Sequence, residues 1–526
     1  MAVSLLASCS SKKDTGASDG TQKSGDSQAG NTGDSLVYAS GEFNGKFSPF
    51  FYETVPDSDM VTQCTAGLLT TDRNGSVVLK GIEGETREYN GKQYTYHSIS
   101  DCTITENSDG TVYYDFKLKD GVKFSDGEPL TVDDVIFSMY VLSDPTYDGA
   151  STFFALPIEG MEAYRSGVDT LFNLMVKAGE NNTDFSKWTE DQQKKFWESY
   201  HKAAEAFVKE IVDSCIASGT NKEGDSIAAV AANYGYPDLK ADATAMDFFN
   251  AMLAKYDGSV KDMSDKESAG TPFSELMDNY QDFAIGVETG TSAPNISGIQ
   301  KTGDNTFRIV TTKVDAQTIY QIGIVVSPLH YYGDKAQYDY ANNKFGFPKG
   351  DLSLIRAKTS KPLGAGPYVF DKYENGVVSL KANPYYDQGE PKTKNLRMSY
   401  INQSDYINSI LAGTADIANP SYTNEIADAI KKANSNGEIS GDKIYTVAVD
   451  ALGYGYIGMN SHNISVNKEP GSDASKNLRR GFATIFAAYR DLAVSTYYGD
   501  RASVINYPIS NTSWAAPQPT DDGYEI

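Results

Sequence analysis

The sequence predicts a multi-lobed protein of mixed strands and helices, of the α/β or α+β class. The chain has 526 residues, which is more than one hydrophobic core usually serves, since single cores stop growing at about 250 to 300 residues. Strand-like patterns occur in the first quarter of the chain and again after residue 296, and a long stretch with helical periodicity separates them. Strands and helices in this order favour several packed units over a single sheet or bundle.

Strands are predicted where apolar and polar residues alternate, or where turn residues bound a short apolar run. Residues 36–39 form such a run, and Gly41 follows it. Alternation predicts a second strand over residues 111–119. The same signals predict further strands at residues 307–311, 368–370, 377–380 and 444–449.

Helices are predicted where a capping signal precedes an apolar period of three to four residues. Thr131 and Asp134 resemble a capping box, so we expect a helix that runs through Leu142. The pattern is helical between residues 154 and 285, where Thr189 and Gln192 cap the longest segment. One face of that segment carries an apolar stripe, which we assign to a core and not to a cofactor site: Phe196, Tyr200, Ala203, Phe207, Ile211 and Cys215. Another helix is predicted at residues 404–411.

The charge of the chain limits its partners. The formal net charge is -24, with 40% hydrophobic and 22% charged residues, a composition typical of a soluble globular protein. Such an excess of carboxylates repels phosphate backbones, and the sequence has no run of Lys and Arg that would form a basic patch. We therefore expect no nucleic-acid partner and an acidic, solvated surface.

The first 35 residues resemble a lipoprotein leader followed by a tether. The run Leu6-Ala7-Ser8-Cys9 resembles a bacterial lipobox, in which the cysteine carries two acyl chains that anchor a protein to a membrane. Because the apolar stretch before it is shorter than a secretory core, we interpret residues 1–9 as a truncated signal with lipid attachment at Cys9; an incidental thiol is the alternative. Residues 10–35 are rich in Ser, Gly and Asp and predict a disordered tether. No later segment is apolar enough to span a bilayer, so lipid is the expected membrane attachment.

Motifs for common catalytic and cofactor sites are missing or out of context. The four histidines, at positions 97, 201, 330 and 462, lack metal-ligand spacing, so we expect no metal. Residues 453–458 fit the pattern G-x-G-x-x-G, but no helix is predicted after them, and no P-loop occurs, so we expect no nucleotide cofactor. The 70 Asp and Glu residues leave a two-carboxylate glycosidase open as an alternative function.

A longer motif carries a family resemblance. Residues 116–138, FKLKDGVKFSDGEPLTVDDVIFS, resemble the signature of the extracellular solute-binding protein family 5, which includes the oligopeptide- and dipeptide-binding proteins of ABC importers. Further segments resemble the family in the same order: residues 67–75, 364–368, 380–386, 410–417 and 478–491. The resemblance extends from about residue 36 to residue 508, and we interpret the chain as truncated at its carboxyl end relative to the family.

The resemblance implies a fold. It is the periplasmic-binding-protein-like type II (cluster C) architecture, an α/β fold with two lobes, three domains and mixed β-sheets. The first domain is expected from residues 36–80 and 290–365, and the second from residues 81–289, with a helical insertion at residues 167–285. An incomplete third domain is expected over residues 366–526.

The resemblance also implies a ligand site between two lobes that close on the solute. Members that bind peptides hold the peptide main chain by strand addition. The segment after the first strand, Gly41, Glu42, Phe43 and Asn44, is similar to the one that lines the cleft. Phe153 and Phe154 lie where the family places aromatic wall residues, although core packing is the slightly favoured alternative for both. Tyr454 and Tyr456 lie on a third-domain segment near the cleft.

The expected function is therefore capture, without catalysis and without a cofactor, of an extracellular oligopeptide. The expected partners are the peptide, an ABC permease with its ATPase, and the outer face of the bacterial cell membrane through the lipid anchor, with the chain itself a monomer. An oligosaccharide or a nickel chelate remains open as the solute.

Overall fold

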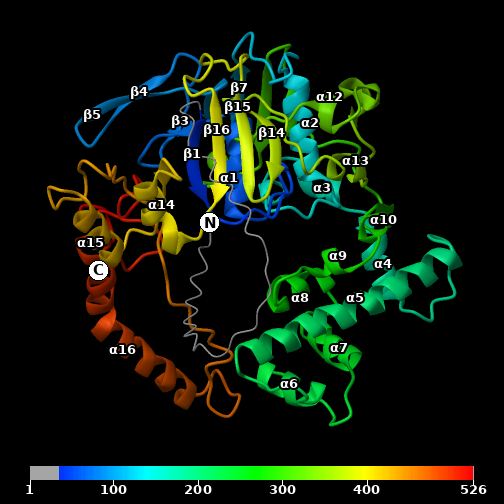
Figure 1. Cartoon of the computed structure of the whole chain (residues 1–526). Helices are drawn as coiled ribbons and strands as arrows, with labels where there is room; N and C mark the ends of the chain where they lie inside the picture. Colours follow the sequence, from blue (N-terminus) through cyan, green and yellow to red (C-terminus); the bar gives the residue numbers. More distant parts are fainter. Residues whose placement is uncertain (1–34, 525–526) are drawn as a thin grey trace, which may run out of the picture.

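The computed structural model describes residues 35–524 and consists of two β-sheets with their packed helices, a bundle of helices, and a carboxyl-terminal segment. In Figure 1 the two sheets lie at the top, and the bundle and the carboxyl-terminal helices lie below them, apart from each other. The mixed content and the long helical stretch agree with the prediction from the sequence.

The larger sheet has five strands in the order β14-β15-β16-β1-β17. β1 is parallel to its neighbours β16 and β17, whereas β14, β15 and β16 are antiparallel in turn. The bounds are β1 Ser35–Ser40, β14 Tyr368–Glu374, β15 Val377–Ala382, β16 Asn395–Tyr400 and β17 Ile417–Ala418. The strands predicted at residues 36–39, 368–370 and 377–380 are therefore confirmed.

This pairing joins segments on the two sides of the predicted domain boundary at residue 366. Residues 395–400 pair along the whole of β1, which the prediction assigned to the other lobe. No local sequence signal reports a pairing over so long a separation, and the division into three domains stays a prediction.

Helices cover both faces of this sheet at β1. Successive side chains of a strand point to opposite faces, and in β1 the residues Val37 and Ala39 pack against the helix α14 (Tyr406–Ala412). Leu36 and Tyr38 pack against the core on the other face, which contains the helix α1 (Val55–Cys64). β1, which lies between β16 and β17, is thus covered on both faces.

The second sheet is antiparallel, in the order β10-β11-β7-β6, and forms the largest core with the helix α2 (Val132–Ser143). Across the β7–β11 pair the rings of Phe116 and Phe307 stack with centroids 4.7 Å apart. The bounds are β6 Ser100–Glu106, β7 Val112–Leu118, β10 Ile299–Lys301 and β11 Thr306–Thr311. The strands predicted at residues 111–119 and 307–311 and the helix after Thr131 are confirmed.

Short elements connect these parts. The strands of the two-stranded sheets are β2 Thr70–Thr71, β3 Val77–Val78, β4 Glu85–Tyr89, β5 Lys92–Tyr96, β8 Val168–Thr170, β9 Gly286–Glu288, β12 Tyr338–Asp339 and β13 Lys344–Phe345. The short helices are η1 Phe153–Ala155, α3 Met161–Arg165, α11 Thr318–Gln321, α12 Leu329–Tyr332, η2 Lys335–Gln337, η3 Tyr340–Asn342 and α13 Ser353–Arg356.

The helical bundle has a core of its own. The side chain of Thr189 caps its longest helix, as predicted, and all six residues of the predicted apolar stripe are buried. The helices are α4 Leu171–Ala178, α5 Glu190–Ala217, α6 Ile227–Tyr234, α7 Ala245–Lys255, α8 Val260–Glu267, α9 Phe273–Leu276 and α10 Tyr280–Phe283.

A buried carboxylate in the bundle accepts hydrogen bonds from three other side chains. Glu267 is 6% exposed and accepts hydrogen bonds from the hydroxyl of Tyr236 at 2.6 Å, the hydroxyl of Tyr256 at 2.7 Å and the Lys255 ammonium at 2.7 Å. Burial raises the pKa of Glu267, but these three donors outweigh it and hold the pKa below its ordinary value.

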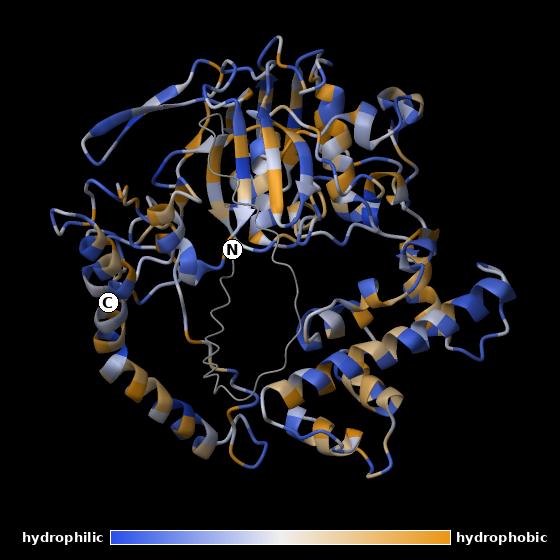
Figure 2. Ribbon diagram, in the orientation of Figure 1, coloured by the Kyte–Doolittle hydropathy of each residue, from blue (hydrophilic) through white to orange (hydrophobic). Residues whose placement is uncertain are grey.

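The carboxyl-terminal segment contains the helices η4 Gln403–Asp405, α15 Asn424–Ala433, α16 Asp473–Tyr498 and η5 Gly499–Arg501. The strand predicted at residues 444–449 is wrong. Its alternating apolar residues Tyr445, Val447 and Val449 are 80%, 70% and 62% exposed, and within residues 35–524 no strand pairs with them. Apolar side chains of α16 are exposed as well, among them Ile485 and Leu492. Figure 2 marks the hydrophobic residues along this helix in orange.

Candidate binding site

The carboxyl ends of three parallel strands meet at one edge of the larger sheet. β16, β1 and β17 end at Tyr400, Ser40 and Ala418, and the chain crosses from β16 through α14 to β17, on the other side of β1. In open α/β sheets, ligands bind outside the carboxyl ends of strands, where connections diverge. We call residues 41–44 and 401–414 the carboxyl edge, and this is the candidate site (Figure 1).

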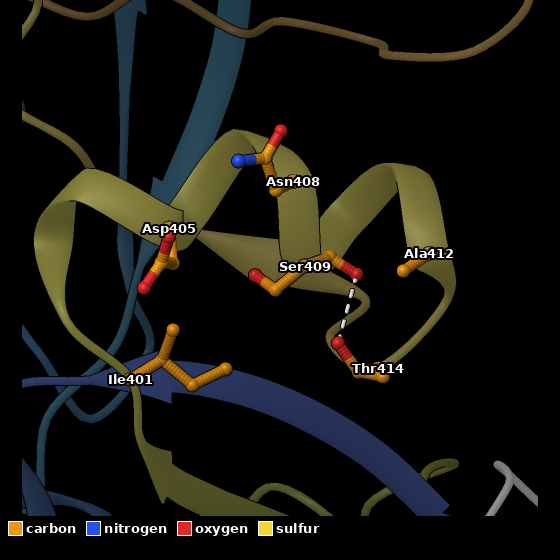
Figure 3. A pocket seen from close by; sticks show the side chains of 6 residues that line it. All are labelled: Ile401, Asp405, Asn408, Ser409, Ala412 and Thr414. Atoms are coloured by element: carbon orange, nitrogen blue, oxygen red, sulfur yellow. Dashed lines mark hydrogen bonds between the residues drawn. The ribbon is translucent and has the colours of Figure 1, made fainter. Parts of the chain in front are cut away.

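A cavity of about 420 Å³ opens at this edge, between the end of β16 and α14. Its lining combines apolar side chains with one carboxylate, one amide and two hydroxyl groups: Ile401, Asp405, Asn408, Ser409, Ala412 and Thr414. Figure 3 shows these side chains on α14 and its flanking turns, with Ile401 approaching from the end of β16. Such groups can hydrogen-bond a polar main chain and pack against its apolar parts.

The geometry of this cavity is set by the end of α14. Gly413 ends the helix with a positive φ of 70°, a conformation that glycine adopts at little cost. The Thr414 hydroxyl then donates to the carbonyl oxygen of Ser409 at 3.2 Å, as Figure 3 shows. The turn therefore holds the two hydroxyl-bearing residues on the same wall.

Residues 41–44, which follow β1 and were predicted to line the site, include two that are exposed to solvent. Glu42 and Asn44 are exposed, and Gly41 is half-buried at a position where a Cβ atom would lie 2.9 Å from Cγ of Pro56. Phe43 is 5% exposed and packs edge-on against the rings of Phe47 and Tyr373. This corrects the prediction for Phe43, because a ring enclosed by two others offers no free face to a ligand.

Asp57 shapes this exit, and the sequence reasoning missed it. The residue is buried, and its carboxylate accepts hydrogen bonds from the backbone nitrogens of Gly45 and Lys46, both at 3.3 Å. Burial raises the pKa of Asp57, while these hydrogen bonds act in the opposite direction. The available signal was the N-cap pattern of Thr54, Pro56 and Asp57, which marks the start of α1 next to the first strand.

The two predicted aromatic wall residues lie in the larger core. Phe153 is fully buried, which corrects its predicted ligand contact in favour of core packing. Phe154 is half-buried, and the guanidinium of Arg165 lies 4.3 Å from the centroid of its ring. A cation over this ring covers part of the surface that a ligand would use.

The predicted tyrosines of the third domain are exposed. Tyr454 and Tyr456 are 46% and 78% exposed, with ring centroids 6.2 Å apart. The stretch before them is fastened to the hairpin β4–β5, since the Tyr89 hydroxyl donates to the Asp450 carboxylate at 2.8 Å and accepts from the Asp450 backbone nitrogen at 2.9 Å. This stretch therefore contacts the hairpin, and the Ser510 hydroxyl also donates to the carbonyl oxygen of Ala451 at 3.1 Å.

Two further features bear on function. Within residues 35–524 no helix has the length and apolar character needed to cross a bilayer. In the same part of the chain no three His, Cys, Asp or Glu side chains come together as metal ligands would. Cys9, the predicted site of lipid attachment, lies outside the described residues.

A family model matches most of the chain. It is described as "Bacterial extracellular solute-binding proteins, family 5 Middle" and matches residues 99–185 and 241–525. The chain belongs to this family. Membership confirms the predicted resemblance and its two-lobed, mixed α/β fold class, and it places the chain among extracellular solute-binding proteins. The unmatched residues 186–240 lie within the predicted helical insertion.

The chain is also similar to named relatives and to solved structures. The oligopeptide-binding protein OppA of Bacillus subtilis is 30% identical over 117 residues, which are 22% of this chain and 21% of that protein. AppA of Bacillus subtilis, solved with a nonapeptide, has 16% identity and a TM-score of 0.38, over 76% of this chain and 46% of that one. NikZ of Campylobacter jejuni, solved with Ni(L-His), has 13% identity and a TM-score of 0.36, over 76% and 45%. The chain thus spans less than half the length of these relatives.

Proposed function

We propose that this protein captures extracellular oligopeptides by lobe closure and delivers them to the permease and ATPase of an ABC importer, without catalysing a reaction. The observation that carries the proposal is the family match over residues 99–185 and 241–525. The oligopeptide-binding protein OppA of Bacillus subtilis also matches, over 117 residues. The chemistry of the carboxyl edge supports the same class of solute.

The carboxyl edge suits an extended main chain. β17 is the last strand of the larger sheet at this edge, so its outer side can pair with an added strand, and Ile417 within it is 43% exposed. The adjoining cavity supplies hydroxyl, amide and carboxylate groups. Strand addition recognises groups that every peptide shares, which explains how one protein accepts many sequences.

Calorimetry of the whole chain against a peptide library tests this proposal. We expect saturable binding of some peptides, together with compaction in small-angle scattering as the lobes close. Saturable binding of nickel–histidine or of oligosaccharides in place of peptides would reassign the solute within the family. Turnover of chromogenic glycosides would instead favour the two-carboxylate enzyme, and the proposal of a pure binder would then fail.

We also propose that the protein is anchored outside the cell through lipid on Cys9. The lipobox-like sequence before Cys9 supports this proposal. Metabolic labelling with a fatty-acid analogue should mark the wild type and the variant Cys215→Ser, but not Cys9→Ser. Equal labelling of all three would contradict the anchor.

A further inference from the structure

The exit of β1 contains an Asn-Gly pair, Asn44 and Gly45. Such pairs are prone to deamidation, because glycine has no Cβ atom to hinder the approach of its backbone nitrogen to the asparagine side chain. That nitrogen attacks Cγ of the asparagine, so that a C–N bond forms and the bond from Cγ to Nδ2 breaks. The side-chain nitrogen leaves as ammonia, with the proton that the attacking nitrogen gives up. Water then opens the succinimide ring to aspartate or isoaspartate.

A carboxylate faces the nitrogen that would attack. The backbone nitrogen of Gly45 donates to the Asp57 carboxylate at 3.3 Å, and the second oxygen of that carboxylate accepts from the backbone nitrogen of Lys46, also at 3.3 Å. A base held at this position can take the proton that the first step releases. Burial raises the pKa of Asp57, which makes its carboxylate a stronger base than an exposed one.

The side chain of Asn44 has space in which to turn toward that nitrogen. Asn44 is exposed and borders a cavity of about 500 Å³. Lys46 and Glu275, whose charged groups are joined by a hydrogen bond, also line this cavity. Asn44 does not have a positive φ, so its backbone lies outside the left-handed region.

The other four Asn-Gly pairs of the chain are held differently. Asn90 and Asn375 lie in the two-residue turns of the hairpins β4–β5 and β14–β15, with positive φ of 51° and 50°. The left-handed conformation of such a turn directs the next backbone nitrogen away from the asparagine side chain. In the remaining two pairs, the backbone nitrogens of Gly75 and Gly437 donate to backbone carbonyl oxygens at 3.0 and 3.1 Å. A carbonyl oxygen is a far weaker base than a carboxylate.

We propose that Asn44 is a site of spontaneous deamidation in the folded protein, with the Asp57 carboxylate as the general base that takes the proton from the backbone nitrogen of Gly45. Either product places a carboxylate in the carboxyl edge where the neutral amide stood. The isoaspartyl product also lengthens the main chain by one methylene group directly after β1. Deamidation therefore changes both the charge and the shape of the candidate site.

Peptide mapping by mass spectrometry tests the proposal on the whole chain. The folded protein is incubated near neutral pH, and conversion is followed at all five Asn-Gly pairs in one sample. We expect conversion at Asn44 to be at least about tenfold faster than at the other four, a modest share of the roughly 10²- to 10⁴-fold that a positioned base contributes. In urea the five rates should become similar, because the fold no longer holds Asp57 against Gly45.

The variant Asp57→Asn distinguishes a base from a restraint. We expect it to slow conversion at Asn44 about tenfold and to leave the other pairs unchanged, whereas a loop that was merely loosened would convert faster. The control is Asp59→Asn, an exposed acid of the same helix, which should leave the rate unchanged.

The pH profile of the wild type gives a measure that needs no variant. The rate at Asn44 should level off once Asp57 is ionised, while the rate in urea keeps rising with hydroxide concentration. A rate at Asn44 no higher than at the other pairs, an unchanged or faster rate in Asp57→Asn, or a folded-state profile that follows hydroxide would each overturn the proposal.

Discussion

Replacing Asp134 by alanine is expected to lower the free energy of unfolding by about 3 kcal/mol. Asp134 is 5% exposed, and its carboxylate accepts hydrogen bonds from the backbone nitrogen and hydroxyl of Thr131, both at 2.8 Å, and from the backbone nitrogen of Leu329 at 2.9 Å. The hydroxyl can rotate to another acceptor, but the two backbone donors cannot. Each buried donor left unpaired costs about 1 to 3 kcal/mol, and removal of a buried charge offsets part of the sum.

The pH dependence gives a second measure of the same contact. Burial raises the pKa of Asp134 above its ordinary value of 3.8, although its hydrogen bonds act in the opposite direction. The folded state therefore binds this proton more tightly than the unfolded state does. The stabilisation that follows is complete below pH 3.8 and is lost as the pH rises through the raised pKa. The wild type should therefore exceed Asp134→Asn in free energy of unfolding by less at neutral pH than at acidic pH.

Chemical denaturation followed by circular dichroism measures both effects. The matched control is Asp133→Asn, because Asp133 is the neighbouring acid, its side chain is 34% exposed, and it pairs with Lys301 at 2.6 Å. We expect Asp133→Asn to lower the free energy of unfolding by about 0.5 to 1 kcal/mol. Equal losses for Asp134→Ala and Asp133→Asn would refute the reasoning, since burial would then not distinguish the two acids.

Three further predictions concern other parts of the fold. Glu267→Gln should destabilise the helical bundle by about 2 kcal/mol in thermal melts at neutral pH; because the pKa of Glu267 is lowered, the difference from wild type should disappear as the pH falls through that pKa. Gly366→Ala should cost about 2 kcal/mol or more in the same melts, since its Cβ would lie 2.4 Å from a backbone nitrogen, whereas Gly453→Ala, with nothing within 4 Å, should be nearly neutral. Burial raises the pKa values of the Cys64 and Cys102 thiols to about 12, so a thiol reagent should label them in urea but not in the folded protein; fast labelling of the folded protein would contradict their burial.

Local signals predicted most of the elements correctly. The cap at Thr189 and the apolar period after it depend only on neighbouring residues, and both are confirmed in α5. The strand predicted at residues 444–449 failed although its alternation is as clear as that of β11. The difference lies outside the segment: β11 has a neighbour on each side, whereas no strand among residues 35–524 pairs with the later segment.

The candidate site was predicted less completely than the fold. The resemblance pointed to the exit of β1, where Glu42 and Asn44 are exposed, and their contact with a ligand stays a prediction. Phe43 and Phe153 are aromatic in sequence and buried in the structure, and residue type alone cannot distinguish a cleft wall from a core. Lys46 and Glu275 were missed because they are 229 residues apart and meet only when the bundle contacts the sheet.

The position of β1 couples stability to binding. β1 pairs with β16 on one side and β17 on the other. One cavity lies beside α14, and a second cavity, of about 500 Å³, is lined by Asn44 and Lys46, which follow β1 in the chain. The first cavity depends on α14, which packs on Val37 and Ala39, and the second depends on the loop that Asp57 fixes next to Lys46. A substitution that loosens β1 would therefore disturb both cavities at once.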